Sequence, residues 1–168
     1  MNVQTVIGEL ESNTFVVETD GAVVIIDAGA PVKSVLKTLA GRTPDAILIT
    51  HFHFDHVFCL ENYKKAFNCP VYAPRTEDEI RVGGLIIRPI LCPGHAPDCV
   101  VYKIGDALFT GDVLFARGIG RMDLPGGSQV EMKATLRRLL GVDFKTAYHG
   151  HYGPSSYAEQ QVNIGRYI

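Results

Sequence analysis

Three histidines and one aspartate lie within the six-residue segment HFHFDH, residues 51–56. His51, His53 and His56 offer imidazole nitrogens, and Asp55 offers a carboxylate. Burying such groups without partners costs free energy, so their density in one short segment is hard to explain as core structure. A bound metal ion would give all four a partner. Imidazole with carboxylate suits zinc, iron or manganese, and the lack of thiolates argues against a closed structural zinc site.

Three more residues of this chemistry follow later in the chain, each in a turn or at the end of an expected strand. They are His95 in PGHAPD, Asp112 in FTGD and His151 in HGHYGP. His149 lies two residues before His151 and is the alternative candidate in that motif. We prefer His151 and predict a metal site whose ligands come from distant parts of the sequence.

Apolar runs of strand length would position these residues. The run DAILIT, residues 45–50, leads directly into HFHFDH, and side chains two apart on a strand point to the same side. His51 and His53 are therefore expected to project together. Further runs of strand type, separated by Gly, Pro and Asp, cover residues 14–19, 22–27, 70–74, 84–91, 98–104, 106–112 and 144–148.

Helical segments alternate with these strands. Helices are expected over residues 31–41, 61–67, 128–141 and 157–168. Ser128 and Glu131 have the spacing of a capping box at the start of the third helix. Strands with intervening helices in both halves favour two packed sheets covered by helices, although a doubly wound single sheet would give a similar order.

Length and composition are those of an ordinary globular protein. The 168 residues suggest one domain spanning 1–168, with 46% hydrophobic and 20% charged residues. A net charge of -2 gives no basic field for a nucleic-acid partner, and no apolar run or leader-like start indicates a membrane or an export route. We therefore expect a cytoplasmic protein that acts on a small molecule. The four cysteines form no CxxC pair and are expected to be buried, reduced thiols.

The order of four motifs resembles the metallo-β-lactamase superfamily, most closely its glyoxalase II-like (hydroxyacylglutathione hydrolase-like) branch. These motifs are HFHFDH, GHAPD, FTGDVLFARGIGRMDLPGG and GHYGPSS, and the similarity covers nearly the whole chain. The resemblance implies an α/β fold of the four-layer αβ/βα sandwich type, with two mixed β-sheets flanked by helices. It also implies two divalent metal ions, with zinc expected and iron or manganese as alternatives.

The resemblance assigns seven metal ligands to these motifs. They are His51, His53 and His95 for the first ion, Asp55, His56 and His151 for the second, and Asp112 as the bridge. Asp55 and Asp112 would also serve as the catalytic carboxylates.

Three further residues have two interpretations each. Asp27 would accept a hydrogen bond from a ligand histidine, or would simply cap a strand end. Arg121 stands where glyoxalase II has a basic residue for glutathione, but it could instead pair with Asp123, which replaces an aromatic residue. Tyr152 could direct its hydroxyl into the active-site cleft, or could be a partly buried core residue.

The expected activity is hydrolysis of a small-molecule thioester or related ester by a metal-bridging hydroxide. No GxSxG segment suggests a serine nucleophile, and a thiolate leaving group with a pKa of about 8.5 departs without a general acid. The alternatives are a mononuclear iron persulfide dioxygenase, or a lactonase, β-lactamase or nuclease on the same fold. A binding module that has lost its chemistry is a further alternative, although the seven ligand positions are intact.

Overall fold

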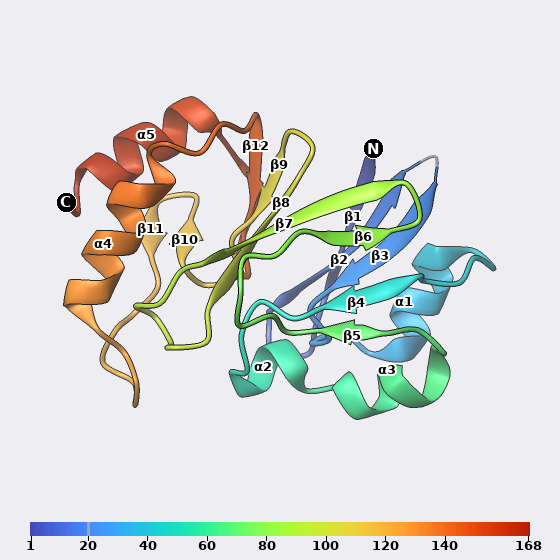
Figure 1. Ribbon diagram of the computed structural model, residues 1–168. Coiled ribbons are helices and arrows are strands. Elements are labelled where there is room, and N and C mark those ends of the chain that lie inside the picture. Colours follow the sequence, from blue (N-terminus) through green and yellow to red (C-terminus); the bar gives the residue numbers. More distant parts are fainter. Residues whose placement is uncertain (20) are drawn as a thin grey trace. The chain divides into compact units, whose positions relative to one another are not determined.

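The computed structural model describes residues 1–19 and 21–168. By the contacts within it, the chain divides into two compact units. Unit 1 comprises Met1–Ala73 and Ile80–Ile86, and unit 2 comprises Pro74–Glu79 and Ile87–Ile168. Each unit has its own helices (Figure 1) and its own apolar core. The expectation of one domain over the whole chain stays a prediction.

Unit 1 is built on a sheet of order β1-β2-β3-β4-β5. Its strands are β1 (Asn2–Ile7), β2 (Asn13–Thr19), β3 (Ala22–Ile26), β4 (Ala46–Leu48) and β5 (Val71–Tyr72). The first three strands pair antiparallel, whereas β3, β4 and β5 run parallel. Parallel neighbours need a crossover connection, which explains the helices between β3 and β4 and between β4 and β5.

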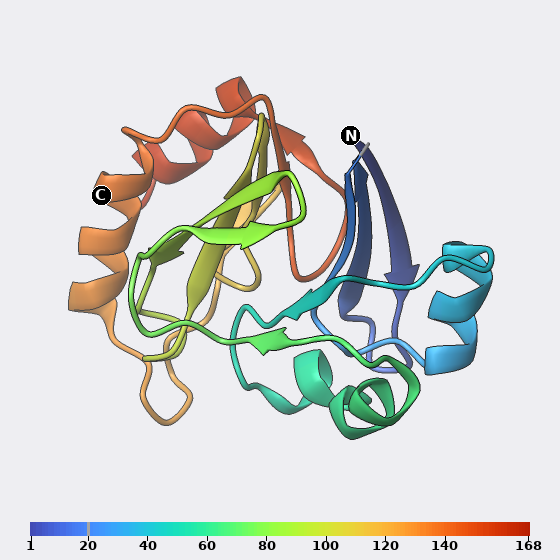
Figure 2. The same cartoon turned by 45° about the vertical axis from the view of Figure 1, so that its right-hand side comes forward.

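Those crossover helices cover one face of the sheet. They are α1 (Val32–Leu39), α2 (Phe54–Val57) and α3 (Leu60–Ala66). Val35 and Leu39 of α1 and Tyr63 of α3 share a buried cluster with Val16 and Ile47 of the sheet. Both views show α1 and α3 as neighbours beside this sheet, with α3 next to β5 (Figures 1 and 2). This packing fixes the carboxyl ends of β3 and β4, where the candidate ligands follow.

The second sheet has the order β13-β12-β9-β8-β7-β6, and a separate hairpin consists of β10 and β11. The strands are β6 (Ile80–Val82), β7 (Leu85–Leu91), β8 (Val100–Ile104), β9 (Ala107–Phe109), β10 (Leu114–Phe115), β11 (Gly118–Ile119), β12 (Thr146–Tyr148) and β13 (Ser155–Ser156). Strands β9 and β12 run parallel, and α4 (Gln129–Leu139) is the crossover between them. Helix α5 (Tyr157–Gly165) packs with α4 on the core of unit 2.

The expected strands and helices are present and most are shorter than expected, whereas β2 begins one residue earlier and α3 is displaced by one residue. Two sheets replace the alternative of a single doubly wound sheet. Sequence patterns missed β1, β6, β10, β11, β13 and the one-turn helix α2. At α4, the Ser128 hydroxyl accepts a hydrogen bond from Glu131 N at 3.2 Å. A complete capping box lies instead at Ser156 and Glu159 of α5. Within residues 1–19 and 21–168, no helix is long and apolar enough to cross a membrane.

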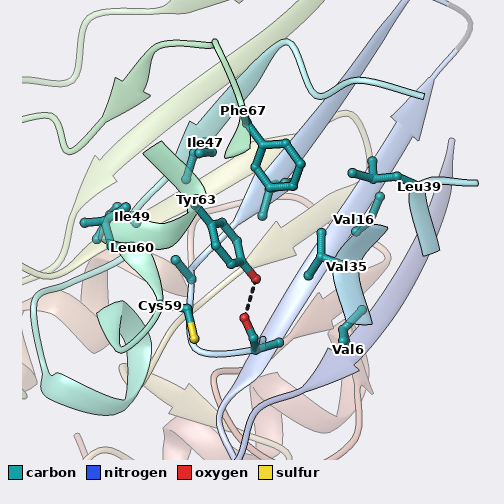
Figure 3. Close-up of a cluster of buried hydrophobic side chains, with 13 residues drawn as sticks. Val6, Val16, Val35, Leu39, Ile47, Ile49, Cys59, Leu60, Tyr63 and Phe67 are labelled. Atoms are coloured by element: carbon teal, nitrogen blue, oxygen red, sulfur yellow. Dashed lines mark hydrogen bonds between the residues drawn. The ribbon is translucent and has the colours of Figure 1, made fainter. Parts of the chain in front are cut away.

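One buried polar contact ties α3 to the loop after β3. The Tyr63 hydroxyl donates to the Ala30 carbonyl at 2.7 Å, inside the apolar cluster drawn in Figure 3. Burial raises the pKa of Tyr63 well above its usual range, so this hydroxyl stays protonated as a donor.

Replacing this tyrosine tests the contact. We expect Tyr63→Phe to lower the free energy of unfolding by about 1–2 kcal/mol, because the Ala30 carbonyl loses its buried donor. Urea denaturation measures the loss, with Tyr167→Phe as the control because Tyr167 is 37% exposed. Equal effects of the two substitutions would contradict the role given to Tyr63.

Candidate metal centre

In unit 1, the candidate ligands follow the carboxyl end of β4. His51 comes three residues after that strand and is 1% exposed, and His53 occupies the N-cap position of α2. Asp55 and His56 lie in α2 itself, and His56 is fully buried. The ring centroids of His51 and His53 are 4.7 Å apart, and those of His51 and His56 are 4.3 Å apart. The HFHFDH segment therefore gathers its imidazoles into one cluster.

A buried carboxylate behind this cluster holds two of its rings. Asp27 Oδ2 accepts a hydrogen bond from His56 Nδ1 at 2.8 Å, while its two oxygens accept from Thr50 N and Thr50 Oγ1, each at 2.8 Å. Because the single hydroxyl proton of Thr50 goes to Asp27, Thr50 Oγ1 accepts from His51 Nδ1 at 3.1 Å. Both imidazoles are thereby fixed with the proton on Nδ1, so that Nε2 carries the lone pair that can bind a metal ion.

The loop after β3 must pass very close to α2 to make this arrangement. A Cβ added at Gly29 would lie 2.4 Å from the Asp55 carbonyl oxygen and 2.2 Å from Ser12 Oγ. Ser12 Oγ itself donates to the Asp55 carbonyl at 2.7 Å. The close approach of two backbone segments therefore requires a glycine at this position, and the hydrogen bond from Ser12 holds the backbone of Asp55.

In unit 2, one carboxylate oxygen is shared by two imidazoles. Asp112 Oδ2 lies 3.6 Å from His95 Nε2 and 3.5 Å from His151 Nε2. His95 Nδ1 donates to the Arg121 carbonyl at 2.7 Å, which again leaves Nε2 unprotonated. Asp112 follows β9 and His151 follows β12, so the two parallel strands deliver these residues at the same edge of the sheet.

His149 is engaged differently from His151. Its Nδ1 lies 2.8 Å from Thr110 Oγ1 and its Nε2 lies 2.9 Å from Ser155 Oγ, so both ring nitrogens are used within the core. Burial lowers the pKa of His149 to about 4, which keeps the ring neutral. This geometry favours His151 as the ligand, and the choice between the two stays a prediction.

The chemistry of these donors fits divalent metal ions. Three Nε2 to carboxylate distances, including 3.5 Å between His56 Nε2 and Asp55 Oδ2, are 3.5–3.6 Å and thus longer than hydrogen bonds. Two donors that share a tetrahedral ion at about 2.0–2.1 Å lie about 3.3 Å apart. Candidate metal ligands are therefore present in both units, and imidazole and carboxylate suit zinc, iron or manganese.

The remaining two candidates lie at the surface of unit 2. The Arg121 guanidinium binds both Asp123 oxygens at 2.7 and 2.6 Å, so the alternative pairing exists in the structure. This pairing lowers the pKa of Asp123 to about 2. Tyr152 is 78% exposed and packs edge-on against Phe115, so it is not a partly buried core residue. Their roles toward a substrate stay predictions.

Sequence reasoning missed Thr50, which joins His51 to Asp27, and it missed the turn after β10 beside His151. Thr50 had a weak signal, because it is a hydroxyl residue at the end of an otherwise apolar run. Phe115 and Arg117 stand within the third motif, but no spacing rule connects them with residues 151–152.

Comparison with known proteins agrees with the motif order. The family model of the metallo-β-lactamase superfamily matches residues 7–82 and 74–151. The probable metallo-hydrolase YqgX of Bacillus subtilis is 28% identical, and the match covers 89% of each chain. A hydroxyacylglutathione hydrolase of Rhodopseudomonas palustris (strain BisB5) is 38% identical over 79% of this chain and 58% of its own. The chain thus spans just over half of that relative.

Solved structures share the arrangement of strands and helices. ETHE1 from Myxococcus xanthus is 27% identical, with a TM-score of 0.86 over 99% of this chain and 84% of its own. TTHA1623 in a di-iron-bound form is also 27% identical, with a TM-score of 0.84 over 97% and 98%. The BLEG-1 B3 metallo-β-lactamase is 23% identical, and its TM-score of 0.90 over 99% and 100% bears on the fold alone. The expected fold class, with two mixed sheets flanked by helices, is confirmed.

Gly120 offers a test of the cluster in unit 2. A Cβ added there would lie 1.9 Å from the Asp112 carbonyl oxygen and 2.9 Å from His95 Cβ and Cγ. We therefore expect Gly120→Ala to displace both residues and to lower the metal content of the purified protein, measured by elemental analysis. Gly165→Ala is the matched control, because its Cβ would have nothing within 4 Å. Full metal content in Gly120→Ala would contradict the placement of His95 and Asp112 as ligands.

Proposed function

Because the chain belongs to the metallo-β-lactamase superfamily, we propose that it is a dinuclear metal-dependent hydrolase of small-molecule thioesters or related esters. The hydroxyacylglutathione hydrolase relative, 38% identical, supports a thioester as substrate and the glyoxalase II-like branch as the place of this chain. The proposed partner is a small molecule, and neither nucleic acid nor membrane is proposed.

The position of Asp112 carries the proposal. Its Oδ2 lies 3.6 Å from His95 Nε2 and 3.5 Å from His151 Nε2. In the proposed assignment these two histidines would bind different ions, and Asp112, with one oxygen at nearly the same distance from both, would be the ligand that the two ions share. His51 and His53 complete the first ion's ligands, and Asp55 and His56 complete the second's.

The chain's own residues hold these ligands in one protonation state. Asp27, acting directly on His56 and through Thr50 on His51, presents Nε2 of both rings as electron-pair donors. Zinc, or iron or manganese, would supply Lewis acidity that polarises the scissile carbonyl and makes water nucleophilic at neutral pH. The Asp55 carboxylate, 27% exposed, is accessible enough to accept a hydrogen bond from that water. A thiolate of pKa about 8.5 then leaves without a proton donor.

The number of bound metal ions is the first expected outcome. Protein purified without added metal should contain about two ions per chain, and Asp55→Ala, His56→Ala or His151→Ala should each reduce this to about one. His149→Ala should keep about two while lowering thermal stability, because His149 bonds Thr110 and Ser155 within the core. Elemental analysis with a melting curve separates the two effects. About one ion, mostly iron, with oxygen consumption on a persulfide, would replace the proposal by the mononuclear dioxygenase.

Catalysis is the second expected outcome. A panel of acyl-thiol substrates and lactones, followed by thiol release or by pH change, should identify a hydrolysed thioester. Asp112→Asn should lower kcat/KM by about a thousandfold, because a neutral amide is a poor bridging ligand. Asp106→Asn is the control, since Asp106 pairs with Lys145 at the exposed surface. Failure to cleave any acyl-thiol in protein with two bound ions would overturn the thioester assignment.

A further inference from the structure

A small apolar pocket lies beside His151 within unit 2. It has a volume of about 390 Å³ and is lined by Phe115, Ala116, Arg117, Gly118 and Tyr152. This volume is in the lower part of the range of small-molecule sites, roughly 300–1,000 Å³. The ring of Phe115 lies 6.0 Å from that of His151 and 5.8 Å from that of Tyr152, centroid to centroid. The pocket therefore shares two of its lining side chains with the surroundings of a candidate metal ligand.

Tyr152 forms one wall of the pocket at an energetic cost. Its φ of 66° lies in the left-handed region, which is unfavourable for a bulky side chain and natural for glycine. The side chain is 78% exposed, so burial in the core does not compensate the backbone strain. Strain of this kind at an exposed aromatic residue next to a candidate ligand indicates a role in binding.

Buried side-chain amides of α5 hold the backbone of the other lining residues. Gln160 Nε2 donates to the Phe115 carbonyl at 2.8 Å, and Asn163 Nδ2 donates to the Gly118 carbonyl at 2.9 Å. Both side chains are at most 2% exposed. The backbone of the turn that carries Phe115 and Arg117 is thus fixed before any ligand binds, which lowers the entropy cost of binding.

Arg117 is exposed and lines both this pocket and a second pocket that Glu159 and Arg166 also line, so it places a positive charge beside the apolar pocket. Within the described residues its guanidinium makes no hydrogen bond or ion pair, whereas Arg121 is held by Asp123. The charge of Arg117 attracts the carboxylate of Glu159, whose Oε2 already accepts from Ser156 N and Ser156 Oγ, each at 2.7 Å. Arg117 is therefore available to bind an anionic group.

We propose that Phe115 and Tyr152 bind the apolar part of the substrate and that Arg117 binds an anionic group attached to it. The substrate class is then a thioester or ester with an apolar, preferably aromatic, portion that ends in a carboxylate or similar anion. This inference rests on the proposed function, since the reacting bond must lie near His151. It makes Arg117, Phe115 and Tyr152 specificity-determining residues.

Binding of two probes to the purified full chain tests the inference without any turnover. The probes are 3-phenylpropane-1-sulfonate, which is a weak metal ligand, and the uncharged 3-phenyl-1-propanol, both titrated by calorimetry. The sulfonate should bind about tenfold more tightly than the alcohol, because it adds a charge-assisted contact with Arg117. Equal affinities, or no binding of either probe, would overturn the proposal.

Substitutions then test which residues cause the tighter binding of the sulfonate. Arg117→Gln should remove the difference between the probes, whereas Arg137→Gln, at an exposed arginine of α4, should preserve it. Tyr152→Gly should lower the affinity for both probes about fivefold, because apolar contact is lost. The melting temperature should be unchanged or raised, because the backbone strain is relieved. Ala40→Gly is its control, since Ala40 has a φ of 51° in unit 1. Loss of binding in either control would also overturn the proposal.

The two hypotheses can fail separately. A probe preference that depends on Arg117 in a protein that hydrolyses no ester or thioester would reject the hydrolase and keep the anionic pocket. Thioester hydrolysis with unchanged kcat/KM in Arg117→Gln and Tyr152→Gly would reject the pocket and keep the hydrolase.

Discussion

The hydrogen bonds of the buried Asp27 carboxylate are the interaction on which the rest of the site depends. A carboxylate that is 1% exposed needs several donors to offset its lost hydration, and Asp27 has three within 2.8 Å. These donors come from Thr50, two residues after β4, and from His56 in α2. One charge therefore joins the ends of β3 and β4 to the short helix and sets the tautomers of His51 and His56. Its own backbone, with a φ of 61°, is held in a conformation that aspartate tolerates better than most residues.

In unit 2, a neutral group sets the tautomer of the candidate ligand His95. A backbone carbonyl, that of Arg121, sets the tautomer of His95, and Gly120 allows this loop to approach both His95 and Asp112. The motif HGHYGP contains two histidines with different surroundings. His149 is enclosed by Thr110 and Ser155, whereas His151 is partly exposed beside Asp112. The chain bends at residues 150–152 after β12, so these two histidines do not share one side as they would on a continued strand, and one is structural while the other is a candidate ligand.

Specificity in this fold comes from the loops around a common ligand set. In this chain the third motif carries two arginines with opposite environments: Arg121 is bound by Asp123, and Arg117 lines an apolar pocket. Tyr152, the exposed tyrosine beside His151, is also unusual, because its backbone conformation would suit glycine better. In the proposed function these residues determine substrate choice, and the seven candidate ligand residues are all present in the sequence.

The sequence by itself determined the family, the ligand candidates and most longer elements. Three imidazoles and a carboxylate within residues 51–56 identify a metal motif because such groups are costly to bury in any other way. Apolar runs such as residues 45–50 identify strands because their periodicity is local. Only the tertiary structure decided that Thr50 links His51 to Asp27, that His149 bonds Thr110 39 residues away, and that Tyr152 is exposed. Hydrogen-bond partners so far apart are set by strand pairing and helix packing. The two-residue strands β10, β11 and β13 likewise depend on their neighbours, because segments of that length have no periodicity of their own to detect.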